Sequence, residues 1–396
     1  MLQPPSRPLK IAILSSGKTA STPRLKQAFA ARGHKVRVLA PEDLRIDLSA
    51  NEPQLLYHGK PLNLPDVVVP RIPSSKTFFG VSLVAQFEQM GVFTLNSSQA
   101  IQASRNKLRA LQKLSRHGIG LPETVFFSGS ADARAAIAGV GGVPVIIKLL
   151  EGTQGIGVML AESQDVAMAI LETLRKTGQD ALVQRFVSES RGKDVRALVV
   201  GGRVLGAVRR QAAGTEFRSN IHRGGEAVRI DLPPDYERTA VAAAQVLGLH
   251  VAGVDMLESE QGPLLVEVNS SPSIDGMEGV TGLDLAGPIV ELVEQRAHVK
   301  PLDVVQRLSL QRGYGVAELN VSPKMAIAGK PLSETGLREA GLQVLYVTRG
   351  SEVFPGPRGT FVLEPGDAAL MFGPLEAIKA FLPAKPPRKP VVKNGG

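Results

Sequence analysis

The hydrophobic residues of the N-terminal region come in short runs separated by turn-forming residues. Apolar runs predict three strands, at residues 9–14, 36–39 and 66–69. Between the first two, Thr22 and Pro23 predict the start of a helix that Gly33 ends. This strand–helix–strand order is typical of a small parallel α/β domain, to which we assign residues 1–96.

The central part of the chain has the pattern of two α+β lobes, at residues 97–187 and 188–298. The patterns predict strands at residues 124–127, 143–149, 158–161, 181–187, 193–200, 203–210, 251–257 and 263–269. They predict helices at residues 101–117, 131–139, 164–176, 236–247 and 283–296, and a polar loop at 211–226.

The pattern changes after residue 298, which indicates a separate C-terminal unit. We expect a linker at residues 299–312, a small α+β unit at 313–383 and a flexible basic tail at 384–396. Within this unit the predicted strands are 314–320, 342–348, 359–363 and 368–372, and the predicted helices are 332–340 and 374–381.

Composition narrows the class of protein. The 396 residues suffice for several domains, and the absence of cysteine excludes disulfides, thiolate metal sites and cysteine nucleophiles. No apolar run reaches the roughly 20 residues of a membrane span, and we expect a soluble cytoplasmic protein. A net charge of +9 suits anionic ligands, whereas 4% aromatic residues and no recognisable motif argue against direct nucleic-acid reading.

A glycine-rich loop follows the strand that ends near Lys148. Its sequence, EGTQGIG, occupies residues 151–157. Glycines allow the backbone to approach a ligand closely and to direct N–H groups at it, and a lysine adds a point charge suited to phosphate. The loop therefore indicates phosphate binding, with an ordinary structural turn as the alternative.

Two acidic residues lie in neighbouring predicted strands. Asp255 and Glu267 are equidistant from Gln261 in the predicted turn, so a regular hairpin would place them face to face, with Asn269 on the same face as Glu267. Like charges about 5 Å apart are unfavourable unless they are neutralised. Two carboxylates and an amide oxygen are hard ligands that suit magnesium. The alternative is a pair of solvated surface acids.

Basic residues gather between the predicted strand at 203–210 and the following helix. Arg209 and Arg210 are followed by the loop FRSNIHRGG at residues 217–225. Guanidinium groups bind carboxylate or phosphate oxygens through paired hydrogen bonds. The loop therefore indicates an anion site, or, alternatively, a solvated basic surface.

With these motifs in hand, residues 9–297 resemble the RimK-type ATP-grasp ligases. The resemblance is carried by VVVPRIPSSKTFFG, IIKLLEGTQGIGV, FRSNIHRGG, VAGVDMLES and LLVEVNSSP. It implies an ATP-grasp fold, with a pre-ATP-grasp parallel α/β domain and two α+β lobes. It also implies a ligase that uses ATP and Mg²⁺ or Mn²⁺ to add L-glutamate to the C-terminus of a small-subunit ribosomal protein.

The resemblance also implies roles for individual residues. Residues expected to bind ATP are Lys107, Lys148, Gly152, Thr153, Gln154, Gly155, Ile156, Gly157, Gln184, Arg185, Phe186, Val187, Asp194, Arg218, Ser219 and Asn220. The expected metal ligands are Asp255, Glu267 and Asn269. The expected catalytic residues are Arg210, Arg218 and Asn220, and the expected substrate-binding residues are Arg209, Arg210, His222, Arg223 and Gly224.

The resemblance assigns a task to each group of residues. The lysines would contact phosphates, backbone at Arg185 and Phe186 would read adenine, and Asp194 would hold the ribose. Arg218 would stabilise the tetrahedral oxyanion. The family usually has an acidic residue at the position of Asn106 and a glutamate at that of Arg185.

The C-terminal unit departs from these ligases and resembles the C-terminal domain of TrkA/RCK potassium-channel regulators. LQVLYVTRGSEV and LEPGDAALMFGP carry this resemblance. It suggests a small-molecule effector or a homo-oligomer. Two other functions stay open: a ligase for a cofactor or an amino-acid carrier protein, and a non-catalytic nucleotide-binding regulator.

Overall fold

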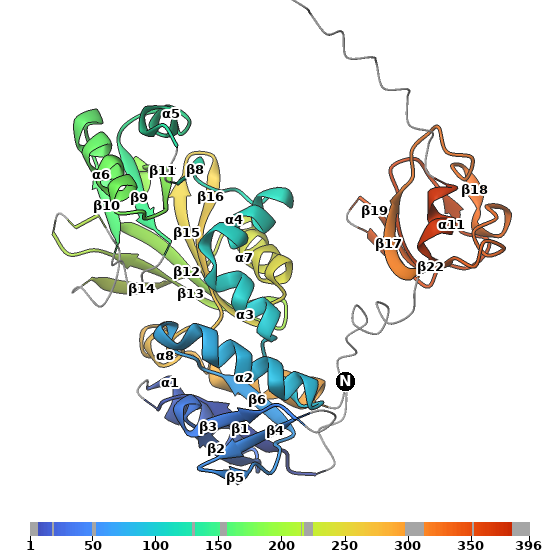
Figure 1. Ribbon diagram of the computed structural model, residues 1–396, viewed down its shortest axis with the longest axis horizontal. Helices are drawn as coiled ribbons and strands as arrows, with labels where there is room; N and C mark the ends of the chain where they lie inside the picture. The colour runs from blue at the N-terminus through green and yellow to red at the C-terminus, as the bar shows by residue number, and fades with distance from the viewer. Residues whose placement is uncertain are drawn as a thin grey trace, which may run out of the picture. The chain divides into compact units, whose positions relative to one another are not determined.

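The computed structural model divides into two compact units, residues 1–300 and 301–396. It describes residues 7–17, 20–49, 53–128, 131–150, 157–214, 216–217, 225–297, 313–350 and 352–381. The predicted linker at 299–312 and the predicted tail at 384–396 lie outside these residues. Figure 1 labels the elements, and each unit is described by itself.

The first unit opens with a parallel sheet, as its apolar runs predict. The strand order is β2 (Lys35–Leu39), β1 (Lys10–Leu14), β6 (Val67–Pro70) and β7 (Phe93–Thr94). Helix α1 (Ser21–Ala31) packs on one face together with α9 (Ala286–Arg296), and α2 (Thr77–Gln89) packs on the other. A three-stranded antiparallel sheet adjoins it, formed by β3 (Leu44–Asp47), β4 (Gln54–Tyr57) and β5 (Lys60–Pro61).

A four-stranded antiparallel sheet forms the lobe drawn at the far end of this unit from the parallel sheet (Figure 1). Its order is β10 (Val158–Ala161), β9 (Val145–Leu149), β11 (Ala181–Arg185) and β8 (Thr124–Phe127). Helices α5 (Ala133–Ala138) and α6 (Gln164–Lys176) share a buried apolar cluster with it.

A five-stranded antiparallel sheet lies between these two parts. Its order is β14 (Glu226–Ile230), β13 (Arg203–Gln211), β12 (Lys193–Val200), β15 (Val251–Ser259) and β16 (Gly262–Asn269). Helices α3 (Ser98–Arg105), α4 (Lys107–Arg116) and α7 (Pro234–Leu247) cover one face. Part of the other face packs against α8 (Asp275–Thr281) and α9, which leaves its remaining part for charged side chains.

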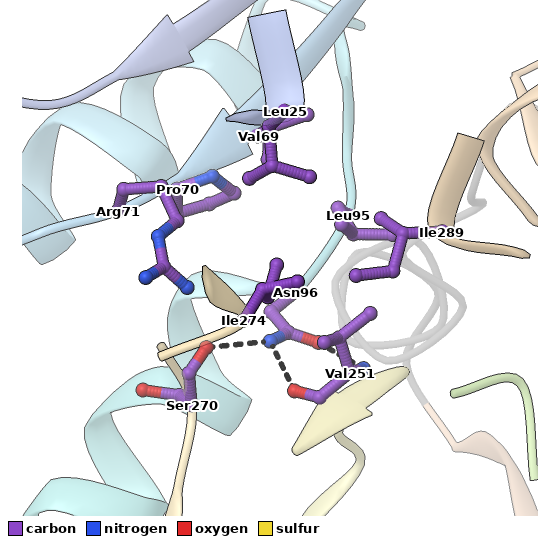
Figure 2. Close-up of a pocket in the computed structure, with 10 residues that line it drawn as sticks. All are labelled: Leu25, Val69, Pro70, Arg71, Leu95, Asn96, Val251, Ser270, Ile274 and Ile289. Atoms are coloured by element: carbon purple, nitrogen blue, oxygen red, sulfur yellow. Dashed lines mark hydrogen bonds between the residues drawn. The ribbon is translucent and has the colours of Figure 1, made fainter. Parts of the chain in front are cut away.

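Asn96 joins the parallel sheet to the five-stranded sheet. Its buried amide donates to the carbonyls of Val251 and Ser270, at 2.8 and 2.9 Å, and its oxygen accepts from the N–H groups of His250 and Val251 (Figure 2). All four hydrogen-bonding positions of the amide are therefore used.

The second unit has a sheet ordered β17 (Tyr314–Asn320), β22 (Ala368–Pro374), β19 (Gln343–Arg349) and β20 (Glu352–Pro355). A small ladder joins β18 (Lys330–Pro331) to β21 (Val362–Leu363), and α11 spans Leu375–Lys379. Short 3-10 helices occur in both units, at Pro41–Asp43, Ser74–Lys76, Ser188–Ser190 and Leu332–Glu334. None of the helices described in either unit is long and apolar enough to cross a bilayer.

Several predicted elements were wrong in detail. The single helix predicted at 101–117 is two helices, because Asn106 caps α4 by accepting from the N–H of Arg109. Strand β14 and helix α8 were missed, and Gly282 (φ +69°) separates α8 from the next helix. The helix predicted at 332–340 is only a 3-10 turn, since Gly336 (φ +72°) leaves the right-handed region.

Candidate active site

Strand register gathers charged side chains on one face of the five-stranded sheet. Arg210 lies opposite Asp194, and Arg196 lies opposite Asp255, which in turn lies opposite Glu267. Residues directly opposite one another share a face, as do residues two apart on a strand. The sequence therefore places all five side chains together without any contribution from loops.

The predicted pairing of Asp255 with Glu267 is confirmed, although the hairpin is less regular than expected. Its turn pairs Ser259 with Gly262, and the register then shifts by one residue between Asp255 and Met256. This β-bulge restores the alignment that a turn centred on Gln261 would have given.

Asp255 is held by two guanidinium groups. Arg196 Nε and Nη2 donate to its two oxygens, each at 2.6 Å, and Arg210 Nη2 lies 3.1 Å from Oδ2. Arg210 Nε also donates to Asp194 Oδ1 at 2.7 Å, so Asp194 is buried and engaged by an arginine. Arg196 was not among the predicted site residues. The available signal was its alternation with Asp194 on a strand next to the acidic hairpin.

Asp255 and Glu267 differ in their pKa, and the contacts around each explain why. Burial alone would raise the pKa of Asp255, but the charges of Arg196 and Arg210 outweigh it and hold that pKa below its usual value. The Glu267 side chain is accessible to solvent yet closely surrounded by protein atoms. That environment, reinforced by the negative charge of Asp255, raises the pKa of Glu267.

Two lysines approach this acidic pair from other elements. Lys148 lies on β9, and burial lowers its pKa to about 8, although the charge of Glu267 acts in the opposite direction. Lys107 is the first residue of α4, and its Nζ donates to the carbonyls of Leu149 and Leu150, each at 3.1 Å. The structure thus brings both predicted phosphate lysines to the end of β9, near Glu267.

The glycine loop is described only at its last residue. Gly157 adopts φ +78°, and a Cβ there would lie 3.0 Å from Leu149 Cδ1, so both backbone and space favour glycine. The other loop residues predicted to bind ATP lie outside the described residues: Gly152, Thr153, Gln154, Gly155 and Ile156. The same holds for the predicted residues Arg218, Ser219, Asn220, His222, Arg223 and Gly224.

The stretch predicted to lie against adenine follows the end of β11. Gln184 is buried, and its amide donates to Thr124 Oγ1 at 2.8 Å. The Arg185 guanidinium forms an ion pair with Glu123, and the N–H of Phe186 donates to the Pro144 carbonyl at 3.3 Å. The Arg185 side chain and the N–H groups of Arg185 and Phe186 therefore all have partners within the protein, and base recognition at this stretch stays a prediction. Val187, next in the stretch, is buried.

One predicted substrate residue is in the wrong place. Arg209 precedes Arg210 on β13, so its side chain points to the opposite face of the sheet. There it donates to both carboxylate oxygens of Glu258, at 3.0 and 2.6 Å. Of the two predicted substrate arginines, only Arg210 therefore lies on the face that carries Asp194 and Asp255.

The donor set of Asp255, Glu267 and Asn269 fits a hard divalent cation. The set has two carboxylates and one amide. Within the described part of the chain, no group of three or more His, Cys, Asp or Glu side chains forms a candidate metal site. Magnesium commonly binds with one or two carboxylates when phosphates and water complete its shell. A cation here would share Asp255 with Arg196.

The sequence matches known families over almost its whole length. Residues 9–101 match the RimK pre-ATP-grasp domain, residues 104–293 the RimK-like ATP-grasp domain, and residues 316–384 the TrkA-C domain. The chain is 52% identical to a probable alpha-L-glutamate ligase of Rhodopirellula baltica, over 98% of this chain and 96% of that protein. It is 49% identical to one of Picosynechococcus sp., over 73% of this chain and 96% of that protein.

Solved structures agree with this assignment. The RimK domain ATP-grasp protein of Sphaerobacter thermophilus is 27% identical, with a TM-score of 0.56, and covers 72% of this chain and 98% of its own. The ATP-grasp ligase PsnB, complexed with a minimal precursor, shares the fold at 20% identity and a TM-score of 0.59, covering 73% of this chain and 98% of its own. The chain belongs to the RimK-like ATP-grasp family and is an ATP-dependent acid–amino-acid ligase with an additional C-terminal TrkA-C domain.

Proposed function

We propose that the protein uses ATP and a divalent cation, Mg²⁺ or Mn²⁺, to add L-glutamate to the C-terminal carboxylate of a protein or peptide. A small-subunit ribosomal protein is the acceptor that the family resemblance favours. The names of the relatives support glutamate as the amino acid. The observation that carries the proposal is the approach of Lys107 and Lys148, from other elements, to the opposed pair Asp255 and Glu267.

The reaction would proceed in two steps. The acceptor carboxylate attacks the γ-phosphate of ATP, which forms an acyl phosphate and releases ADP. The amine of glutamate then attacks the acyl carbon, phosphate leaves, the amine loses a proton, and an amide forms.

The residues of this chain supply position and charge. Lys107 and Lys148 would bind phosphate oxygens, and Arg210 would add positive charge next to the acids. Asp255, Glu267 and Asn269 would hold the cation, which when bound neutralises charge on the phosphates. Asp194 binds Arg210 and so acts as a positioning residue. To contact a ribose as well, its carboxylate would have to bind the ribose and Arg210 at the same time.

This charge set also weighs against a non-catalytic regulator, since such a protein needs no opposed acids beside two lysines. The test is direct: incubate the purified protein with ATP, Mg²⁺, glutamate and peptides carrying ribosomal-protein C-termini, and follow peptide mass. We expect ADP release coupled to a gain of one or more glutamyl residues. ADP release with glutamate but no glutamyl product on any C-terminal carboxylate would contradict the proposal.

A further inference from the structure

Arg71 occupies a position where open α/β sheets bind ligands. It follows β6, and its N–H donates to the carbonyl of Leu14, the last residue of β1, at 2.9 Å. The chain leaves β1 toward β2 on one side and later reaches β6 on the other. The carboxyl ends of β1 and β6 therefore flank the point where the strand order reverses, and ligands bind at such points.

The guanidinium of Arg71 has unused hydrogen-bonding capacity. Its Nη1 donates to the carbonyl of Pro272 at 2.6 Å, whereas its Nε is buried without a partner, as is Ser271 Oγ. No carboxylate among the described residues forms an ion pair with it. Burial lowers the pKa of Arg71 to about 10, although the charge of Asp275 acts in the opposite direction. The buried cation is thus only partly compensated, and a bound anion would stabilise it.

A second arginine adds positive charge beside it. Arg105 donates to the carbonyl of Ile72, to the carbonyl of Pro73 at 3.1 Å and to Thr77 Oγ1 at 2.7 Å. These bonds fix the loop that follows Arg71. The charge of Arg105 contributes to the lowered pKa of Arg71.

Both arginines are linked through the chain to residues of the candidate reaction centre. Arg105 is two residues before Lys107, and Pro272, the partner of Arg71, is three residues after Asn269. A cavity of about 10 Å³ lies beside Arg71, Asn96 and Ser270 (Figure 2). It has room for one water at most, so an amino acid would meet Arg71 on its solvent-accessible side.

We propose that Arg71 binds a carboxylate of the free amino-acid substrate, with Ser271 as an additional hydroxyl partner and Arg105 as a second positive charge that favours a dicarboxylate. This inference rests on the proposed function and names the site of its amine donor. The guanidinium fork suits a carboxylate because two parallel N–H groups can donate to its two oxygens.

Binding of glutamate to the full-length protein with Mg²⁺–ADP, measured by calorimetry, tests this site. We expect Arg71→Lys, which keeps the charge but removes the fork, to weaken glutamate binding by at least about tenfold and to leave nucleotide affinity unchanged. Ser271→Ala should weaken it less. Arg45→Lys, at an exposed arginine paired with Asp47, is the matched control.

The outcomes separate this site from the proposed function. Glutamate affinity within twofold of wild type in Arg71→Lys, or an equal loss of nucleotide affinity, would overturn the role of Arg71 while glutamyl transfer by the wild type still stood. If the wild type binds aspartate in an Arg71-dependent way but neither binds nor transfers glutamate, the site stands and the proposed function fails.

Discussion

At the scale of single residues, Asp255 and Glu267 have different environments although they face each other. Asp255 is neutralised by two arginines, whereas Glu267 is accessible and has a raised pKa. The negative charge of Asp255 is already compensated by arginines. A divalent cation bound between the two acids would therefore interact mainly with the uncompensated charge of Glu267. Lys148 has the complementary property, a lowered pKa that an arriving phosphate would raise.

Replacing Glu267 by alanine should lower ATP-dependent ligation by about 10²–10³-fold or more, because the site loses a negative charge needed to hold the cation. The fold should be retained, since the Glu267 side chain is exposed. Circular dichroism and ADP release measure the two effects. Glu260→Ala, in the exposed turn of the same hairpin, is the control and should retain activity; near-normal ADP release by Glu267→Ala would contradict the role.

Nucleotide affinity should fall as pH rises above about 8. The free protein holds Lys148 with a pKa of about 8, and bound phosphates stabilise its protonated form, so binding takes up a proton in this range. A fluorescent ATP analogue titrated between pH 6.5 and 9.5 would measure the effect. Lys148→Arg, which stays charged, should flatten the profile, and an unchanged slope in that variant would assign the pH dependence to another group.

At the scale of elements, the hairpin of β15 and β16 aligns the acids, and Asn96 fixes where this hairpin meets the parallel sheet. The amide of Asn96 is buried and fully hydrogen-bonded to the start of β15 and to the residue after β16. Such a residue is more than a packing contact, because its removal leaves buried backbone groups without partners.

Asn96→Ala should therefore lower the free energy of unfolding of the first unit by about 2–4 kcal/mol. Denaturant unfolding followed by circular dichroism would measure the change. Gln102→Ala, at an exposed position on α3, should change it by less than about 0.5 kcal/mol. A loss for Asn96→Ala no larger than that of the control would show that the four hydrogen bonds do not stabilise the junction.

The sequence predicts some contacts of this site but not others, and the difference has physical reasons. The pairing of Asp255 with Glu267 was accessible because a short hairpin fixes its own register. The contact of Arg196 with Asp255 was not, because it depends on which strand lies beside β15. Arg209 was grouped with Arg210 and the basic loop that follows, although neighbouring residues of a strand point to opposite faces.

At the scale of the whole molecule, the described part of the candidate active site lies entirely within the first unit. The second unit has its own apolar core and its own ion pair, in which the partly exposed Arg349 donates to both oxygens of the buried Asp367 at 2.7 and 2.8 Å. These hydrogen bonds lower the pKa of Asp367. The small unit is therefore expected to have a stability of its own.

Asp367→Asn in the full-length chain should destabilise the second unit and leave nucleotide binding unchanged. Because the pKa of Asp367 is lowered on folding, its contribution is present above the ordinary value near 4 and is lost as pH falls through the lowered value. Calorimetry should show one transition moving down in the variant and, for wild type, the same transition weakening in acid. A shift of both transitions, or loss of nucleotide affinity, would contradict this independence.

The central claim is that Asp255, Glu267 and Asn269 hold a divalent cation on the phosphates of ATP, beside Lys107 and Lys148. The most direct test is a crystal structure with a non-hydrolysable ATP analogue and Mn²⁺, located by anomalous scattering. We predict an anomalous peak within about 2.0–2.3 Å of oxygens from Asp255 and Glu267, with Lys148 Nζ at a phosphate oxygen. A metal–nucleotide complex bound elsewhere, or an Asp255 still held only by Arg196 and Arg210 with nucleotide present, would contradict the account.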